Sequence, residues 1–445
     1  MKITFIRPHM TAVRAADALE PLVFGLLASL TPPDVELALY DDRIESIPYD
    51  EPTDLVALTV ETFTAKRAYQ IAARFRQRGV PVVMGGYHPT LLPDEAGQYA
   101  DAVAVGDAET TWPQIVADVR AGTLQPVYRS ETNLALQGVA PRRSLFKGKR
   151  YGPLRIVQFG RGCRFACDFC SIHAFYGHAT PRRCMEGVLA ELEGLRGQFV
   201  FFADDNLLID PDQAEALFRA LKPLNIHWAC QISLDIVQNP HLLDLMGASG
   251  CVGALIGFES LEAANLAQMK KKWNTRQGDY ADALAQLYAR GIMVFGSFVF
   301  GYDHDNPSSF DRTLDFALKS KLALAQFNSL YPMPGTPLYE RLRSEGRLRF
   351  ERWWLDDAYR YGETIFQPKN MTPDQLRDGI IRLRREFNTY GSIARRMFEP
   401  HANARSPYHL FAYLMVNLVT KKEIRNKQGE ALGDGSPLPA YREAA

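Results

Sequence analysis

Three cysteines lie within one short stretch of the chain, and this stretch constrains the fold more than any other feature. Residues 159–173 read FGRGCRFACDFCSIH, which gives Cys163, Cys167 and Cys170 the spacing Cys-x3-Cys-x2-Cys. They follow an apolar, strand-like run at 154–159, so we expect them on a loop at the end of a strand. Thiols at this density favour metal binding over cross-linking in a reducing compartment.

The spacing suits an iron–sulfur cluster better than a zinc ion. Three thiolates on one loop can hold three irons of a [4Fe–4S] cluster and leave the fourth iron open. A structural zinc site normally needs four ligands in two separated pairs, and no second pair follows at such a spacing. His173 offers a fourth zinc ligand, but its closeness to Cys170 makes the geometry awkward. We therefore predict that the three cysteines bind a [4Fe–4S] cluster.

The first 130 residues alternate between apolar runs and amphipathic helix patterns. In the stretch 65–77, for example, Ala68, Ile71 and Phe75 share one helical face. This alternation predicts an α/β fold with a doubly wound parallel sheet covered on both sides. The expected strands are 3–6, 35–40, 55–60, 80–84 and 102–105.

Ligands of such sheets bind beyond the carboxyl ends of the strands, which directs attention to residues 59–62, 85–90 and 106–109. Paired glycines permit close approach of a ligand to the backbone, although a tight strand-to-helix turn explains the pair equally simply. No G-x-G-x-x-G follows the first strand, so we do not expect a dinucleotide site. The candidate ligand-binding residues at these strand ends are Thr59, Glu61, Gly85, Gly86, His88, Gly106 and Glu109.

The cysteine spacing, with Phe169 directly before the last cysteine, resembles the radical S-adenosylmethionine superfamily. In that family the open iron chelates S-adenosylmethionine, and reduction of the cluster cleaves a C–S bond, usually to a 5′-deoxyadenosyl radical. The resemblance implies a partial (β/α)6 barrel with the chemistry at the strand ends, and an external electron donor of the flavodoxin or ferredoxin type. Strand-like runs that fit lie at 154–159, 199–203, 228–233, 253–257, 294–300 and 324–329, with helical patterns between them.

The resemblance also assigns expected roles to polar residues at the barrel's strand ends. Asp205, in the run Asp204-Asp205-Asn206, lies where the family places groups near the methionine amine. Gln231 and Ser233 lie where ribose hydroxyls are held, and Glu259 closes a strand where it can contact ribose or methionine. Helix N-caps are the alternative interpretation for the aspartates and for Glu259.

The remaining cysteines have a different interpretation. Cys230 and Cys251 lie in or beside apolar runs, so we expect buried structural roles for them. Cys184 opens a helical pattern, where a thiol can become more acidic, but a catalytic role is the less favoured interpretation.

The two halves together resemble the subclass of this superfamily that has an N-terminal cobalamin-binding domain. GGYHPTLLPDEA at 85–96 and AVAVGDAET at 102–110 carry the resemblance, and the general order also looks like the magnesium-protoporphyrin cyclase and hopanoid methylase branches. It implies a Rossmann-like cobalamin domain at 1–145, the cluster-binding barrel at 146–345 and a helical substrate or capping region at 346–445.

The chain departs from many cobalamin domains at one point. These carry Asp-x-His-x-x-Gly, whose histidine binds cobalt, but none of the nine histidines here has an aspartate two positions before it. Either cobalamin binds without this histidine or the domain has lost the cofactor. His9, just after the first strand, is the other polar group of interest, and we expect it at the surface.

The C-terminal region gives weaker signals. Thr372-Pro373 predicts the N-cap and first residue of a helix. Trp353-Trp354 is expected to pack on the barrel rather than line a substrate pocket. Residues 407–419 are apolar on nearly every face, which favours a buried helix over an interfacial one. Residues 427–445 are expected to form a flexible tail.

Composition narrows the class of protein. Fifty-one basic and 51 acidic residues cancel, so no overall basic charge favours nucleic acid as a partner. The apolar runs are too short to cross a membrane, and the N-terminus lacks a signal-peptide core, so we expect a cytoplasmic protein.

The function predicted from the resemblance is a cobalamin-dependent methyltransferase that acts on an unactivated carbon or phosphorus centre of a small molecule. One alternative is a radical S-adenosylmethionine enzyme without cobalamin, which either transfers a 3-amino-3-carboxypropyl group or forms a ring by oxidation. An iron–sulfur redox sensor is the other alternative, and it is disfavoured because no DNA-reading element is apparent.

Overall fold

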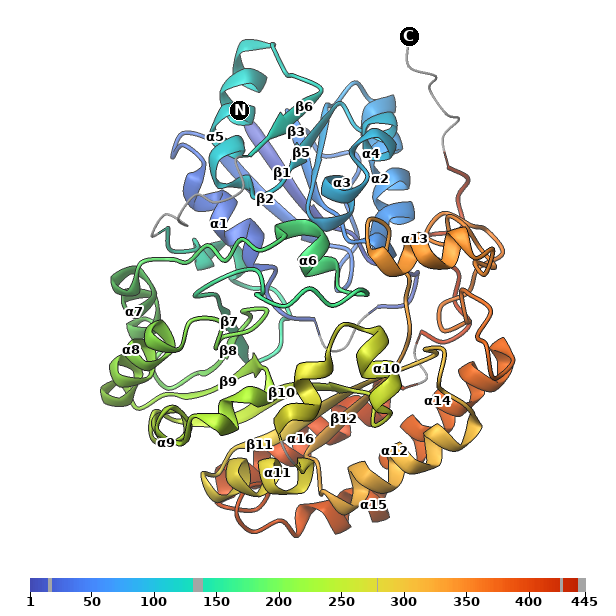
Figure 1. The fold of residues 1–445 in the computed structure, drawn as a ribbon. Helices are drawn as coiled ribbons and strands as arrows, with labels where there is room; N and C mark the ends of the chain where they lie inside the picture. The colour runs from blue at the N-terminus through green and yellow to red at the C-terminus, as the bar shows by residue number, and fades with distance from the viewer. Residues whose placement is uncertain (15–17, 131–138, 278, 425–426, 439–445) are drawn as a thin grey trace.

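The computed structural model describes residues 1–14, 18–130, 139–277, 279–424 and 427–438. Its named strands form two six-stranded sheets, one after the other along the chain (Figure 1). The first has the order β2-β1-β3-β4-β5-β6 and the second the order β12-β11-β10-β9-β8-β7. Neighbouring strands are parallel throughout both sheets, so the predicted α/β fold class is confirmed.

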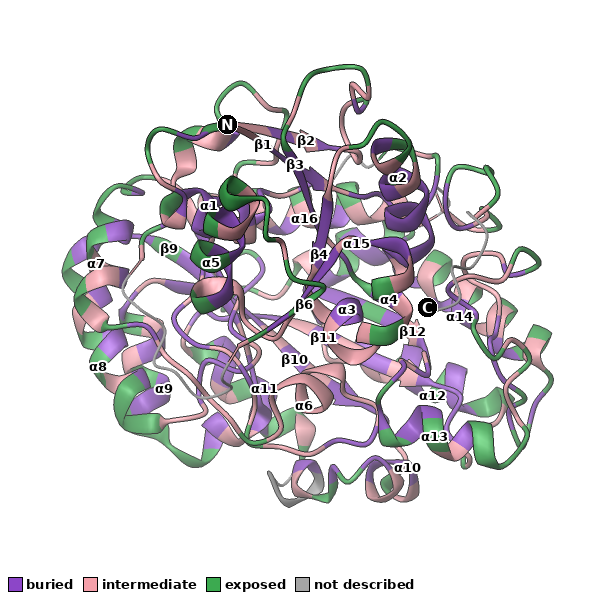
Figure 2. Ribbon diagram, turned by 90° about the horizontal axis from the view of Figure 1, so that it is seen from above, coloured by how far each residue is buried: buried purple, intermediate pink, exposed green. Residues whose placement is uncertain are grey.

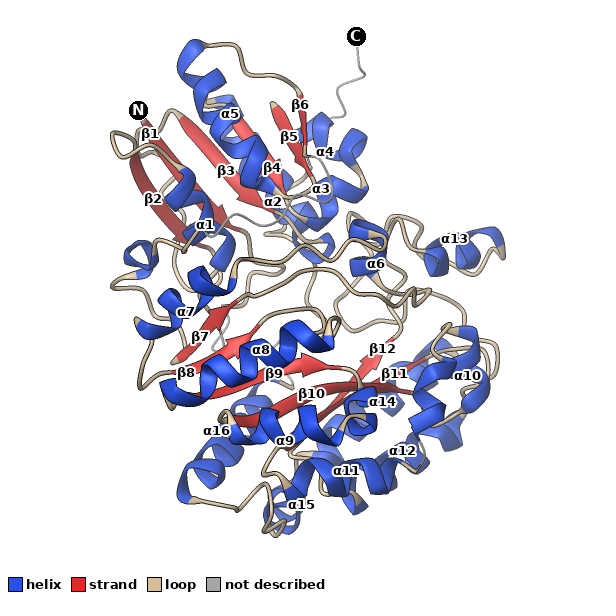
Figure 3. Cartoon of the chain, turned by 60° about the vertical axis from the view of Figure 1, so that its left-hand side comes forward, coloured by secondary structure: helices blue, strands red, loops and turns tan. Residues whose placement is uncertain are grey.

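The first sheet has helices on both faces (Figure 3). On one face, Phe24 of α1 and Trp112 of α5 pack against Phe5 of β1 in a single apolar core. On the other face, α2 contributes Ala68 and Ile71 to a second core. Burial on both faces explains why these strands are continuous apolar runs. The elements are β1 Lys2–Arg7, α1 Leu22–Leu30, β2 Glu36–Asp41, β3 Leu55–Thr59, α2 Ala65–Gln77, β4 Val82–Gly85, α3 Tyr87–Leu91, α4 Pro93–Tyr99, β5 Ala102–Val105, α5 Ala108–Ala121 and β6 Val127–Arg129.

The second sheet is a partial barrel, with its helices outside and its buried strands at the centre of the molecule (Figure 2). Among the described residues β7 and β12 are edge strands, so the sheet does not close. The elements are β7 Leu154–Val157, α6 Ser171–Tyr176, α7 Met185–Glu193, β8 Phe199–Phe202, α8 Pro211–Leu221, β9 His227–Ile232, α9 Pro240–Ala248, β10 Cys251–Glu259, α10 Ala263–Gln268, α11 Tyr280–Ala289, β11 Met293–Phe300, α12 Pro307–Lys319 and β12 Leu324–Ser329.

In the described part of the chain, four further helices follow the barrel. The predicted cap is confirmed, since Thr372 Oγ1 accepts a hydrogen bond from the Gln375 amide at 3.1 Å and Pro373 is the first helical residue. Leu376 and Phe387 on this helix enter the barrel's core. The elements are α13 Pro337–Ser344, α14 Pro373–Phe387, α15 Tyr390–Met397 and α16 Pro407–Glu423.

The prediction of a buried helix at 407–419 is wrong. Within α16 only Tyr413 and Asn417 are buried, whereas Phe411 is 63% exposed and Met415 is 44% exposed. The helix covers part of the barrel with one face and leaves an apolar stripe in solvent. None of the described helices is long and apolar enough to cross a membrane.

Residues 427–438 do not form a free tail, contrary to our expectation. Leu432 is buried in the core beside α2, and the Gly433 amide donates to the Met10 carbonyl at 2.8 Å. Asp434 pairs with Arg67 of α2. This C-terminal segment therefore belongs structurally to the first sheet, while the rest of the expected tail, 439–445, lies outside the described residues.

Trp353 and Trp354 also contribute to the core beside α2. They are 0% and 2% exposed, so the expected packing role holds, but the neighbour is the first domain rather than the barrel. The two tryptophans thus help join the C-terminal region to the first domain. The domain limits 145 and 345 stay predictions.

Candidate functional site

The cysteine loop, residues 159–170, runs from the end of β7 to the start of α6. Cys167 is buried and the other two cysteines are partly buried. Burial raises the pKa of Cys163 and Cys170, and raises that of Cys167 to about 12. The thiols therefore hold their protons at neutral pH until iron displaces them.

Several N–H groups already point at these sulfurs. The Phe165 amide and the Asn206 side chain donate to Cys163, and the Ile172 and His173 amides at the start of α6 donate to Cys170. Donors to sulfur favour the thiolate form and tune a cluster's potential. Among the described residues no three His, Cys, Asp or Glu side chains form a site for a single metal ion. The donor set, three thiols on one loop with amide donors, fits an iron–sulfur cluster.

Asp204 and Asp205, after β8, hold the backbone of the cysteine loop. Asp204 accepts from the amides of Phe159 at 2.8 Å and Gly160 at 2.6 Å, and Asp205 accepts from Gly162 at 2.8 Å. Burial raises the pKa of Asp204 to about 7 and that of Asp205 to about 6. Neither is an N-cap, because Asp210 caps the following helix.

A polar network links the strand ends beside the cysteine loop. The Asn206 amide donates to Ser233 Oγ at 3.0 Å, and Ser233 in turn donates to Asp235. Gln231 donates to the Asp204 carbonyl at 3.4 Å. Gln231 and Ser233 therefore lie beside the Asp204–Asn206 segment that also carries Asp205, and their role in one site stays a prediction.

Glu259 ends β10 with a φ of 61°, a left-handed conformation that is uncommon outside glycine. Its Oε1 accepts from Lys271 Nζ at 2.7 Å, and Lys271 also donates to the Gly257 carbonyl at 2.8 Å. The buried Lys271 ammonium partly opposes the effect of burial on the Cys167 pKa. Glu259 thus lies beside the cysteine loop, paired to a lysine that the sequence analysis did not single out.

The loop after β5 packs directly on the cysteine loop. Arg161 pairs with Asp107 at 2.8 Å and with Glu109 at 2.6 Å, and Tyr176 of α6 donates to Asp107 at 2.9 Å. Tyr87, after β4, lies 4.8 Å from Phe175 between ring centroids. Glu109 therefore faces the cysteine loop. Arg161 stands between the two glycines of FGRGC, a signal that could have marked it.

The other predicted residues at the ends of β3, β4 and β5 make their hydrogen bonds within the first domain. Gly86 has a φ of 108°, and a Cβ there would come within 2.8 Å of the Val60 carbonyl oxygen. His88 is 0% exposed, with its Nε2 3.0 Å from both Tyr69 Oη and Glu95 Oε1. Gly85 pairs with Thr59 in the sheet, and the Gly106 amide donates to Thr90 Oγ1 at 3.0 Å.

A cavity of about 350 Å³ opens beyond the ends of β1 and β3. Glu61 lies in its wall, paired with Arg7 at 2.8 Å. His9 is also in the wall and is 4% exposed, so it is not at the surface as expected. The full lining is Arg7, Pro8, His9, Met10, Leu19, Arg43, Glu61, Phe63, Thr64, Tyr331, Tyr361 and Lys427.

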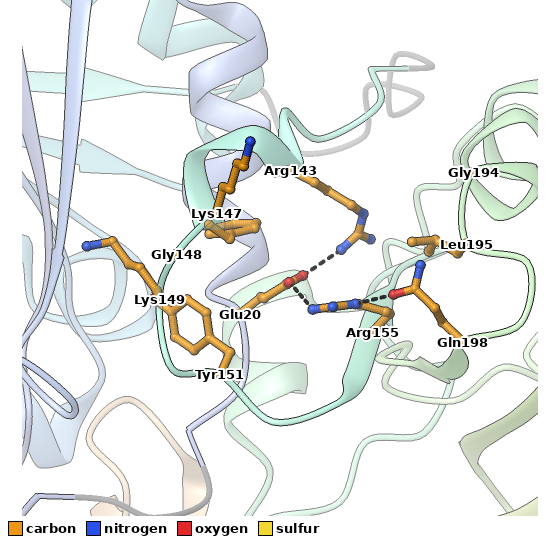
Figure 4. A pocket seen from close by; sticks show the side chains of 11 residues that line it. Glu20, Arg143, Lys147, Gly148, Lys149, Tyr151, Arg155, Gly194, Leu195 and Gln198 are labelled. Atoms are coloured by element: carbon orange, nitrogen blue, oxygen red, sulfur yellow. Dashed lines mark hydrogen bonds and ion pairs between the residues drawn. The ribbon is translucent and has the colours of Figure 1, made fainter.

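A second cavity of about 390 Å³ lies at the junction between the two sheets (Figure 4). The buried Glu20 carboxylate bridges Arg143 at 2.8 Å and Arg155, which stands in β7. Arg143 also reaches Glu191 of α7 at 2.5 Å. These contacts connect Arg143, which lies between the two sheets in the chain, to the first domain and to the barrel. The residues around this cavity therefore have a structural role.

Two of the other cysteines match their expected roles. Cys230 and Cys251 are 0% and 3% exposed in the barrel core. Cys184 is exposed at the N-cap of α7 and makes no side-chain cap hydrogen bond.

Comparison with known sequences places these features in a family. A sequence model of the Radical SAM superfamily matches residues 157–317. The chain is 31% identical over 415 residues to the bacteriochlorophyllide d C-12(1)-methyltransferase of Chlorobaculum tepidum, which covers 90% of this chain and 89% of that protein. It is 27% identical to the C-8(2)-methyltransferase of the same organism, over 78% of this chain and 83% of that protein. It is 26% identical to the hopanoid C-2 methylase of Rhodopseudomonas palustris, over 78% and 68% respectively.

Solved structures show a similar fold. The radical S-adenosylmethionine methyltransferase TsrM from Kitasatospora setae, solved with cobalamin and a [4Fe-4S] cluster bound, matches with a TM-score of 0.63 and 16% identity, over 77% of this chain and 75% of that chain. OxsB, solved with aqua-cobalamin and S-adenosylmethionine, matches with a TM-score of 0.57 and 16% identity, over 78% and 55%. At these identities the likeness concerns the fold.

Proposed function

Because this chain belongs to the radical S-adenosylmethionine superfamily, we propose that it is a cobalamin-dependent methyltransferase acting on an unactivated carbon centre. The observation that carries the proposal is the 31% identity to a bacteriochlorophyllide methyltransferase across 90% of the chain. Of the two centres expected from the sequence, carbon is favoured over phosphorus because that relative and the C-8(2) and hopanoid enzymes are named for methylation at carbon. We take a tetrapyrrole side chain as the first substrate to test.

When bound, the [4Fe–4S] cluster supplies the electron that cleaves S-adenosylmethionine, and cobalamin carries the methyl group. Cys163, Cys167 and Cys170 would hold the cluster. The chain's other residues have supporting tasks: Asp204 and Asp205 fix the cysteine loop through three backbone amides.

The contact of Arg161 with Asp107 and Glu109 closes one side of the barrel mouth. Its Nη atoms reach both carboxylates within 3.1 Å, and all three side chains are largely buried. We propose that this contact excludes water from the radical, since a closed site prevents side reactions.

Gln231, Ser233 and Asp205 are the proposed contacts of S-adenosylmethionine, because they lie at or just after the ends of the neighbouring strands β8 and β9, beside the cysteine loop. Glu259 contributes through its pair with Lys271. The residues after β1 and β3 are the proposed contacts of cobalamin, and Glu61 is in the cavity wall there. The electron donor of flavodoxin or ferredoxin type and the cytoplasmic location stay predictions.

The test is an anaerobic reaction of reconstituted protein with S-adenosylmethionine, a reductant and bacteriochlorophyllide d, with and without cobalamin. We expect 5′-deoxyadenosine, cobalamin-dependent S-adenosylhomocysteine and a product in which a methyl group replaces one hydrogen of the substrate, a net gain of CH2. Methylthioadenosine formed without cobalamin would instead support aminocarboxypropyl transfer. 5′-Deoxyadenosine with an oxidised, unmethylated product would support the ring-forming alternative.

A further inference from the structure

His9 lies where the topology of the first sheet predicts a ligand. The chain passes from β1 to β2 on one side and then to β3 on the other, so the strand order reverses between β1 and β3. Ligands of open parallel sheets bind at this switch point, beyond the carboxyl ends of the strands. Arg7, His9 and Met10 after β1 and Phe63 after β3 line the cavity of about 350 Å³ found there, which we call the switch-point cavity.

The hydrogen bonds of His9 fix its tautomer. Its Nδ1 lies 2.6 Å from the Thr11 carbonyl oxygen, and a carbonyl only accepts, so Nδ1 carries the proton. The His9 amide donates to Asp42 Oδ2 at 3.2 Å, which anchors the backbone of the loop. The bond to Thr11 thus fixes the imidazole ring, and the bond to Asp42 fixes the backbone of His9.

The other ring nitrogen has no partner among the described residues. His9 Nε2 is buried and makes no hydrogen bond. With the proton on Nδ1 and no acceptor among these residues for a second proton at Nε2, the geometry is that of the neutral tautomer, and Nε2 presents a lone pair.

Among the described residues, none of the charged groups around the cavity is hydrogen-bonded to His9 Nε2. Arg7 pairs with Glu61, and Arg43 pairs with Asp41 at 2.6 Å. Lys427 also lines the cavity, and Arg7 Nε has no hydrogen-bond partner in the described chain either, but neither is bonded to the His9 ring. A buried acceptor without a donor is uncommon in folded proteins and calls for a function.

A neutral imidazole that donates one N–H to a carbonyl and presents its other nitrogen is the usual arrangement of a metal-binding histidine. We propose that His9 Nε2 is the lower axial ligand of cobalt when cobalamin binds at the switch-point cavity. Thr11 supplies through its backbone carbonyl the orienting contact that a side-chain carboxylate makes in the Asp-x-His-x-x-Gly pattern, where Arg7 stands instead of the aspartate. This inference rests on the proposed function, because it requires bound cobalamin.

The experiment is electron paramagnetic resonance of cob(II)alamin bound to the full-length, cluster-reconstituted protein. A nitrogen on the cobalt axis splits each cobalt line into three, and ¹⁵N changes this to two. We expect the two-line pattern in protein that is labelled only at histidine with ¹⁵N. A three-line pattern in the labelled protein would mean that the cofactor's own base is the ligand, and no nitrogen splitting would mean water or none; either result overturns the inference.

Variants assign the nitrogen to one residue. His9→Ala is expected to abolish the histidine splitting while His241→Ala, at an exposed position on α9, leaves it unchanged. Persistence of the splitting in His9→Ala would overturn the assignment. If His9→Ala does not fold, His9→Gln provides the same test with a side chain of similar length.

Cobalamin binding is measured separately, by its absorption after gel filtration. Protein that binds cobalamin without a histidine signal contradicts only the role of His9. Protein that binds no cobalamin overturns the cobalamin-dependent function and the His9 inference together.

Discussion

The first domain meets the rest of the protein at two edges that differ in how their polar groups are used. Beyond β5, Arg161 of the cysteine loop is matched by two carboxylates, Asp107 and Glu109, and largely buried with them. Beyond β1 and β3, Arg7 meets one carboxylate, Glu61, which is 52% exposed, and His9 Nε2 has no partner in the described part of the chain. The polar groups of the first edge are paired within the protein, whereas the second edge leaves a buried ring nitrogen without a partner among the described residues.

The largest effect is expected from removing a thiol of the cysteine loop. Cys167→Ala should reduce cluster iron to background. Turnover should fall by more than about 100-fold, because removing a residue that only supports a metal ligand already lowers activity by about 10- to 100-fold. Iron analysis and 5′-deoxyadenosine formation measure this. Cys184→Ala, at an exposed position, is the matched control and should retain both. Full iron content in Cys167→Ala would remove this residue from the cluster.

Breaking the interdomain contact should be the next largest change. Arg161→Gln leaves two buried carboxylates without their cation, which is expected to cost about 3 kcal/mol of unfolding free energy. Urea denaturation measures the loss. Arg196→Gln, whose pair with Glu193 is exposed to solvent, is the control and should cost far less stability. Equal losses in the two variants would show that burial does not decide how much such an ion pair contributes to stability.

A pH effect is expected from Asp204. Its pKa rises from an ordinary 3.8 to about 7, so the folded state binds this proton more tightly than the unfolded state. The stability that this group contributes is present below pH 4 and is lost as the pH rises toward 7, by at most about 4 kcal/mol. Asp204→Asn should therefore become more stable relative to the wild type across this range, as measured by urea denaturation at several pH values. A difference that does not change with pH would contradict the raised pKa.

The smallest effect is expected at the open edge. Arg7→Gln removes one ion pair with a half-exposed carboxylate, so we expect a loss of about 0.2–1 kcal/mol. The same urea assay measures it, and a loss as large as that of Arg161→Gln would remove the contrast between the edges. Cobalamin affinity of this variant, measured in parallel, tests whether Arg7 serves the ligand rather than the fold.

The fold could be predicted from the sequence because its strands are buried on both faces. Such strands appear as apolar runs regardless of their neighbours, and the cysteine spacing is likewise local. β6 was missed because it has three residues, and two of them, Val127 and Arg129, are exposed.

The site was harder to predict because the orientation of a strand-end side chain depends on distant partners. Glu259 turns to Lys271, twelve residues on, and Asp204 reaches back to the amide of Gly160. His88 turns inward because Tyr69 and Glu95 offer it hydrogen bonds. Spacing alone does not contain these contacts. For α16, composition showed apolar residues all round but not which face the barrel would cover.

The C-terminal segment has a consequence for how the protein is made. Leu432 and Asp434 complete the packing on α2, yet they are synthesised several hundred residues after β1. The first sheet therefore leaves the ribosome with the flank of α2 uncovered, and it acquires that cover only when translation has passed the barrel. An affinity tag fused directly behind residue 438 would lie near the Gly433–Met10 contact, next to the loop that carries His9.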